Sequence, residues 1–108
     1  MKAKKVLFVC TGNFDRSPTA EALYKDVEGL EVKSAGTWVH AQNPLTKELV
    51  DWADVIFVME EHHKAAVTRL DPKAADKTVI LGVPDIYHKD QPELKTLLKQ
   101  RLDPYLKP

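Results

Sequence analysis

The apolar residues of this chain fall into two patterns, short continuous runs and longer segments with a helical period. Short apolar runs predict strands buried within a sheet, and we expect four strands, at residues 6–9, 31–34, 54–59 and 78–81, of which 31–34 is the most polar. Apolar residues that recur every three or four positions predict amphipathic helices. These segments predict four helices, at residues 17–28, 44–53, 60–70 and 92–102.

Proline, glycine and asparagine residues predict where the helices begin and end. Pro18 stands at the first helical position and Gly29 just past the end of the first helix, as the preferences of helix termini require. Asn43 is the expected cap of the second helix. Pro104 is expected to stop the last helix, because proline lacks the N–H that a helix interior needs.

The order of these elements indicates the fold class. Strands that alternate with helices predict a parallel sheet with right-handed crossovers. We therefore expect one α/β domain over residues 1–108, with three layers and a four-stranded parallel sheet flanked by helices on both faces. Ligands of such sheets bind beyond the carboxyl ends of the strands, and the loop after residues 6–9 lies at one of those ends.

Composition narrows the classes of partner. The 108 residues include 16 basic and 16 acidic side chains, a balance that argues against a nucleic-acid-binding face. No apolar run approaches the roughly 20 residues of a membrane span, and the run behind the basic first residues is too short for a signal peptide. The single cysteine, Cys10, excludes an internal disulfide and suits a reducing compartment. We expect a cytoplasmic monomer that binds neither nucleic acid nor membrane.

The loop between the first strand and the first helix carries the candidate chemistry. Cys10 lies six residues before Arg16, and the helix begins at Ser17. The backbone N–H groups of such a loop and the positive end of the helix form an anion site, and Gly12 and Asn13 tolerate the left-handed backbone that a tight loop needs. The Arg16 guanidinium can bind two phosphate oxygens, and these surroundings favour a nucleophilic Cys10 thiolate. The residues expected to bind phosphate are Thr11, Gly12, Asn13, Phe14, Asp15, Arg16 and Ser17.

The sequence of this loop resembles a known family signature. Residues 9–21 read V-C-T-G-N-F-D-R-S-P-T-A-E, which is similar to the pattern V-C-x-G-N-x-x-R-S-P-x-A-E of the low-molecular-weight protein tyrosine phosphatases. The resemblance continues at residues 34–37 and 53–59. It implies a small parallel sheet and a phosphomonoesterase that acts through a phosphocysteine, without a metal or other cofactor. The implied partner is a phosphotyrosine protein or a small phosphate monoester.

The resemblance also assigns roles to individual residues. Cys10 would be the nucleophile, and Arg16 would bind the phosphate. Asn13 would hold the loop in shape. Ser17 would donate its hydroxyl to the thiolate while its lone pairs cap the helix.

A late loop supplies the candidate proton donor. The family places its general acid in an Asp-Pro-Tyr-Tyr context, and here residues 83–88 read V-P-D-I-Y-H. Asp85 is therefore the expected general acid, with an ordinary turn residue as the alternative interpretation. Asp90 is the second candidate acid, because isoleucine follows Asp85 where proline is usual. Tyr87 is expected to line the entrance and to stack on an aromatic substrate, and Trp38 is a further entrance candidate.

Departures from the family pattern bear on the same site. Asp15 stands where many members carry a second cysteine, so a protective disulfide with Cys10 cannot form. The Asp15 carboxylate weakens the field at an anion site unless it points away or pairs with a lysine. The segment between Gly36 and Asp51, which shapes the entrance in the family, is shorter here. His62 and His63 begin a helix without clustered acidic or thiol ligands, which predicts a solvated face and no metal site.

Three functions remain open on the sequence. The first is a phosphatase acting on phosphotyrosine or a small aryl phosphate. The second is a thiol-dependent arsenate reductase, which shares this fold and loop type but would need an external thiol, because the chain has no second cysteine. The third is a module that binds phosphate or a phosphorylated partner without hydrolysing it, a hypothesis motivated by Asp15 and the shortened entrance.

Overall fold

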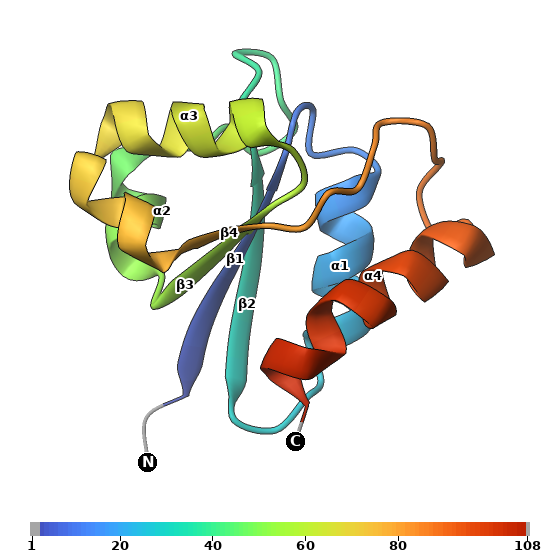
Figure 1. Cartoon of the computed structure of the whole chain (residues 1–108). Coiled ribbons are helices and arrows are strands. Elements are labelled where there is room, and N and C mark those ends of the chain that lie inside the picture. The colour runs from blue at the N-terminus through green and yellow to red at the C-terminus, as the bar shows by residue number, and fades with distance from the viewer. Residues whose placement is uncertain (1–2, 108) are drawn as a thin grey trace.

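A four-stranded parallel sheet forms the centre of the protein, whose residues 3–107 are described by a computed structural model. The strands are β1 (Lys4–Cys10), β2 (Leu30–Gly36), β3 (Val55–Val58) and β4 (Thr78–Ile80), in the order β2-β1-β3-β4. The helices are α1 (Arg16–Tyr24), α2 (Lys47–Trp52), α3 (Glu61–Leu70) and α4 (Pro92–Leu106), with a 3₁₀ turn η1 (Pro72–Lys77) before β4. The predicted α/β class, a parallel sheet with helices on both faces, is confirmed (Figure 1).

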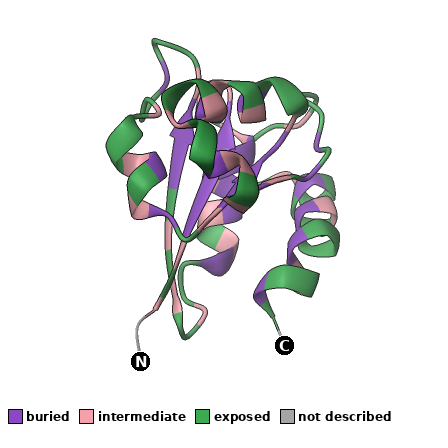
Figure 2. Ribbon diagram, turned by 60° about the vertical axis from the view of Figure 1, so that its left-hand side comes forward, coloured by how far each residue is buried: buried purple, intermediate pink, exposed green. Residues whose placement is uncertain are grey.

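The sheet separates two hydrophobic layers. Side chains alternate along β1, so Leu7 and Val9 pack with residues of α2 and α3, whereas Val6, Phe8 and Cys10 pack with residues of α1 and α4. Figure 1 shows these helix pairs on opposite sides of the sheet, and Figure 2 shows that burial concentrates on the central strands and the helix faces turned toward them. Within residues 3–107, no helix is long and apolar enough to span a membrane.

The carboxyl end of β1 is the point where the sheet can receive a ligand. The chain passes from β1 to β2 on one side, and β3 later pairs with β1 on the other side, which opens a crevice beyond the end of β1. Cys10 ends β1 and pairs in register with Gly36. A Cβ atom at Gly36 would lie 2.5 Å from the Thr11 carbonyl oxygen and 2.7 Å from the Ala41 Cβ. Glycine is therefore needed for β2 to approach the loop that follows Cys10.

Helices α1 and α2 have boundaries that differ from the predicted ones. Helix α1 begins two residues before Pro18 and ends at Tyr24, short of the expected end at residue 28. The cap of α2 is Thr46, whose hydroxyl accepts a hydrogen bond from a backbone N–H of the helix at 3.2 Å. Asn43 is not the cap, because its side-chain amide donates to the Ser34 carbonyl at 2.7 Å and so holds the preceding loop to the end of β2.

The prediction that Pro104 stops the last helix is wrong, because α4 continues through it to Leu106. Leu102 and Leu106 are both buried in the hydrophobic layer that contains α1. The helix must continue for Leu106 to reach that layer, and its burial offsets the hydrogen bond that proline cannot donate. The turn η1 is a further element that the periodicity did not predict, and the Asp71 carboxylate stabilises its start by accepting the N–H of Lys73 at 3.1 Å.

Candidate active site

The loop between β1 and α1 presents its backbone N–H groups to one side. The carbonyls of residues 10–12 accept hydrogen bonds from the backbone N–H groups of Thr37, Trp38 and Gln42, at 2.9–3.0 Å. In a planar trans peptide the N–H points opposite to the C=O. The N–H groups of residues 11–13 are therefore directed away from the 37–42 segment, and Thr11 and Gly12 line the hollow beside Cys10. Such a row of N–H groups forms an anion-binding nest.

Beneath this loop, Cys10 contacts a buried hydroxyl. The Cys10 Sγ lies 2.9 Å from the Ser17 Oγ, and Asn13, in the left-handed region with φ of 58°, donates its amide to that oxygen at 2.8 Å. The Ser17 hydroxyl also lies within donating distance of the Ala35 carbonyl, at 3.3 Å. Its single proton can thus turn to the carbonyl when Cys10 is a thiol and to the sulfur when Cys10 is a thiolate, and only the second arrangement stabilises the ionised nucleophile. Ser17 does not cap α1, because it is the second residue of the helix.

Arg16 is buried, with 1% of its surface exposed, and its guanidinium is held by three parts of the chain. Nη1 donates to the Val83 carbonyl at 2.8 Å and lies 3.1 Å from the Glu60 carboxylate. Nη2 donates to the Thr11 hydroxyl at 3.3 Å, and Nε lies 3.8 Å from the Asp85 carboxylate. These contacts fix the planar fork beside the Cys10 loop before any oxyanion arrives, which is the preorganisation that phosphoryl chemistry requires.

His63 is a part of the site that the sequence analysis missed. It is fully buried, so the prediction of a solvated face is wrong for this residue, although His62 is exposed. His63 Nδ1 accepts the backbone N–H of Glu60 at 3.0 Å, which leaves the proton on Nε2 to donate to the Thr11 hydroxyl at 2.9 Å. Burial, reinforced by repulsion from His62 and Arg16, lowers the pKa of His63 to about 3. The neutral ring therefore braces the loop, and it forms a capping box with Glu60 at the start of α3.

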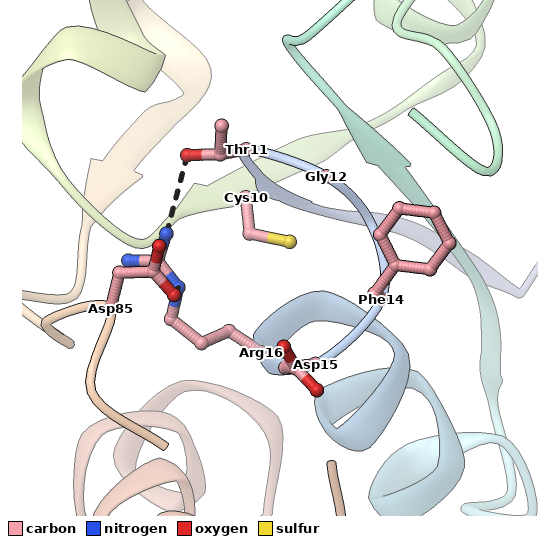
Figure 3. A pocket seen from close by; sticks show the side chains of 7 residues that line it. All are labelled: Cys10, Thr11, Gly12, Phe14, Asp15, Arg16 and Asp85. Carbon is pink, nitrogen blue, oxygen red and sulfur yellow. Dashed lines mark hydrogen bonds and ion pairs between the residues drawn. The ribbon is translucent and has the colours of Figure 1, made fainter. Parts of the chain in front are cut away.

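A pocket of about 220 Å³ opens above the sulfur. Figure 3 shows Arg16 and Asp85 on one side of the Cys10 sulfur and the Phe14 ring on the other, with Asp15 at the start of α1. The residues that line the pocket are Cys10, Thr11, Gly12, Phe14, Asp15, Arg16 and Asp85. Asn13 and Ser17 are buried and support the pocket without lining it.

The other candidates lie outside the pocket lining. Asp90 lies in the turn before α4, with φ of 63°, and does not line the pocket, so Asp85 is the candidate acid that the fold brings there. Tyr87 is half-buried against the hydrophobic layer between the sheet and α4. Trp38 is 48% exposed and stands edge-on to His40, with ring centroids 5.1 Å apart. Neither aromatic residue lines the pocket itself.

One group of side chains lies close enough together to hold a metal ion. Among the residues that the structure describes, Glu60, His62 and His63 place ligand atoms within 4.8 Å of one another. Both ring nitrogens of His63 already make hydrogen bonds, and the Glu60 carboxylate faces the Arg16 guanidinium. A cation there would displace those bonds and meet a positive charge, so the geometry favours bracing of the loop over metal binding.

A thiol in an anion-binding loop, with a buried guanidinium beside it at the carboxyl edge of a parallel sheet, defines the class of cysteine-dependent phosphatases. The family model described as low molecular weight phosphotyrosine protein phosphatase matches residues 5–51. The chain is 34% identical to the low molecular weight protein-tyrosine-phosphatase Etp of Escherichia coli (strain K12), covering 84% of this chain and 82% of that protein. The chain therefore belongs to the low-molecular-weight phosphotyrosine protein phosphatase family, and the resemblance and enzyme class predicted from the sequence are confirmed.

A second relative and a solved structure add detail. The chain is 32% identical to the protein-arginine-phosphatase of Bacillus subtilis (strain 168), covering 88% of this chain and 92% of that protein. That alignment runs over 138 positions, more than this chain's 108 residues, so the relative has insertions that this chain lacks. The chain is also similar to a cysteine-to-serine mutant of YwlE arginine phosphatase with a phosphorylated active-site serine, with a TM-score of 0.69 and 30% identity, covering 89% of this chain and 91% of that one.

Proposed function

We propose that this protein hydrolyses phosphate monoesters of other proteins, phosphotyrosine foremost, through a phosphocysteine on Cys10. The observation that carries the proposal is the arrangement around the sulfur. The Ser17 hydroxyl lies 2.9 Å below it, and the Arg16 fork and the inward N–H groups of residues 11–13 surround the space above it. A phosphoryl group in that space has its oxygens bound and its phosphorus in front of the nucleophile.

In the first step, the Cys10 thiolate attacks phosphorus as the bond to the leaving oxygen breaks. Charge on the equatorial oxygens is stabilised by the loop N–H groups and by Arg16. Asp85, protonated at this stage, transfers its proton to the leaving oxygen, so that an alcohol or phenol departs. The products are the phosphocysteine, the free hydroxyl compound and the Asp85 carboxylate.

In the second step, water attacks the phosphocysteine. The Asp85 carboxylate removes a proton from that water as the sulfur–phosphorus bond breaks, and the electron pair returns to Cys10 as a thiolate. Inorganic phosphate leaves, and Asp85 is again protonated for the next cycle. Asp85 is placed for both roles because its side chain is 64% exposed and lines the pocket, where it can meet the leaving oxygen and the attacking water.

Protein phosphoarginine is the second candidate substrate. The B. subtilis relative is named a protein-arginine-phosphatase, and two carboxylates, Asp15 and Asp85, line this pocket. Carboxylates complement a guanidinium leaving group. The exposed Phe14 ring at the opposite wall instead favours a tyrosine ring, which it can stack against.

The test is steady-state hydrolysis of para-nitrophenyl phosphate in the presence of EDTA, with Cys10→Ser alongside. Turnover that survives EDTA and is lost in a folded variant supports the proposal, whereas full activity of the variant overturns it. A folded but inactive protein that binds vanadate would instead identify a phosphate-binding module. Phosphotyrosine and phosphoarginine peptides of one sequence then decide between the two substrates by their kcat/KM values.

The charge and the single cysteine bear on the compartment, the oligomeric state and the partners of the enzyme. We infer a cytoplasmic monomer that binds neither nucleic acid nor membrane, because the formal net charge is zero and the one cysteine, Cys10, is a free thiol. Size-exclusion chromatography with light scattering measures the oligomeric state, and a stable dimer would contradict this inference.

A further inference from the structure

Asp15 connects the start of α1 to the late loop, which we define as residues 83–90. The Asp15 Oδ1 accepts the backbone N–H of Lys89 at 2.9 Å, across 74 residues of sequence. The next N–H, of Asp90, donates to the Thr19 hydroxyl at 3.0 Å. That hydroxyl in turn donates to the Asp15 carbonyl at 2.7 Å. The first turn of α1 thus holds two consecutive N–H groups of the late loop.

The Asp15 side chain makes the bond to Lys89 in place of the usual helix-capping bond. Asp15 is the N-cap residue of α1, and an aspartate at that position commonly accepts an N–H of its own helix. Here the side chain makes no capping bond. Its carboxylate oxygen is instead directed to Lys89, which lies far along the chain. Because a carboxylate beside a phosphate site weakens oxyanion binding, a position this unfavourable calls for a compensating role.

The held segment is the one that carries the proposed acid. At its start, the Val83 N–H donates to the Met59 carbonyl at 2.9 Å, and the Val83 carbonyl accepts from Arg16 at 2.8 Å. At its end are the bonds from Lys89 and Asp90. Asp85 lies between these two anchors in a stretch, residues 84–86, that is exposed to solvent. The position of its carboxylate over the pocket therefore depends on both anchors.

We propose that Asp15 is a positioning residue, which holds the late loop so that Asp85 stays within reach of the leaving oxygen. This inference rests on the proposed function, because it assigns Asp15 an effect on proton delivery. It differs from a direct role in phosphate binding, which would act on every ester alike. An anchor for the acid acts most on esters whose leaving group needs the proton.

The first experiment compares Asp15→Ala with Asp15→Asn on phenyl phosphate, a poor leaving group, and para-nitrophenyl phosphate, a good one. The alanine variant loses the acceptor, and we expect kcat for phenyl phosphate to fall about 10-fold further than kcat for the nitrophenyl ester. The asparagine variant keeps an oxygen that accepts the Lys89 N–H, and its ratio of the two rates should stay near that of the wild type. Equal slowing of both esters, or identical ratios in the two variants, would overturn the positioning role.

The second experiment removes the donor and uses a matched pair at Lys89. Lys89→Pro deletes the N–H, whereas Lys89→Ala keeps it and removes only the side chain. We expect the proline variant to reproduce the leaving-group effect of Asp15→Ala and the alanine variant to resemble the wild type. Combining Asp15→Ala with Lys89→Pro should add no further effect, because both remove the same bond. Additive losses in the double variant would contradict a shared bond.

Amide exchange at Lys89 tests the Asp15 anchor separately from the proposed phosphatase activity. Lys89 is exposed, so its amide should exchange slowly with solvent only while Asp15 binds it. NMR exchange should show protection in the wild type and Asp15→Asn and its loss in Asp15→Ala. A protected Lys89 amide in Asp15→Ala would refute the anchor itself. A wild-type protein inactive toward both esters would refute the proposed function, and with it the positioning role.

Discussion

The two loops that meet at the pocket are held in different ways. In the loop after β1, Cys10, Asn13, Arg16 and Ser17 are each at most 3% exposed, and their polar atoms hydrogen-bond to one another, to β2 and to the Val83 carbonyl. The Thr11 hydroxyl of the same loop bonds to His63 of α3. In the late loop, residues 84–86 are exposed and the backbone is fixed at its ends. The fold thus makes the geometry of attack rigid and leaves proton delivery to a more lightly held segment.

This difference separates two kinds of effect. Changes in the buried loop should lower the turnover of every ester, because each ester needs the same phosphoryl geometry. Changes in the late loop should distinguish esters by leaving group and by shape. The comparison predicts which ratio of rates, and not only which rate, each substitution alters.

The largest effect is expected for Arg16→Lys. Lysine keeps the charge but has no planar fork, and it cannot bind Val83, Glu60 and a phosphoryl group together. We expect kcat/KM to fall at least about 100-fold for good and poor leaving groups alike. The matched control is Arg101→Lys, on the exposed face of α4, which should retain activity. A loss confined to poor leaving groups would mean that Arg16 acts mainly through Asp85.

A smaller and more selective effect is expected for Asp85→Asn. The amide cannot supply the proton, so hydrolysis of phenyl phosphate should slow about 100-fold while the nitrophenyl ester changes much less. Asp90→Asn is the matched control in the same loop. Steady-state kcat for both esters measures the contrast. If Asp90→Asn shows the selective loss and Asp85→Asn does not, the acid is Asp90.

The structural features behind these effects differ in how far the sequence alone predicts them. The strands, the helices and the phosphate loop could be predicted because they depend on local features, namely apolar periodicity and residues 9–18. His63 could not, because its burial comes from contact with Thr11, 52 residues away. The bond between Asp15 and Lys89 is equally non-local. The continuation of α4 through Pro104 is also non-local, because tertiary burial of Leu106 overrides a local helix breaker.

A loss common to all esters is expected for Ser17→Ala. Alanine removes the hydroxyl that can donate to the sulfur, at 2.9 Å in the protein. The attacking sulfur loses a stabilising hydrogen bond, so kcat/KM should fall about 10-fold for phenyl phosphate and para-nitrophenyl phosphate alike. Steady-state rates for the two esters measure this loss. An unchanged kcat/KM for both would mean that the Ser17 hydroxyl does not act on the sulfur.

The smallest effect on catalysis, and the clearest on stability, is expected for His63→Gln. The pKa of His63 is lowered to about 3 in the folded protein, against an ordinary value of about 6.5. Between these values the unfolded chain binds a proton that the folded chain does not, so the free energy of unfolding must fall as pH drops from about 6.5 toward 3. The slope contributed by His63 reaches about 1.4 kcal/mol per pH unit.

Glutamine does not titrate and can still donate an N–H toward Thr11, so the variant should lose this part of the pH dependence while keeping most of its activity at pH 7. Urea unfolding at pH 7 and pH 5 should show the wild type losing about 2 kcal/mol more than the variant. His62→Gln, at the exposed neighbour, should keep most of the wild-type slope. Parallel curves for wild type and His63→Gln would mean that the ring is protonated in the folded state. In that case His63 could not accept the Glu60 N–H, and the brace between α3 and the phosphate loop would need a different explanation.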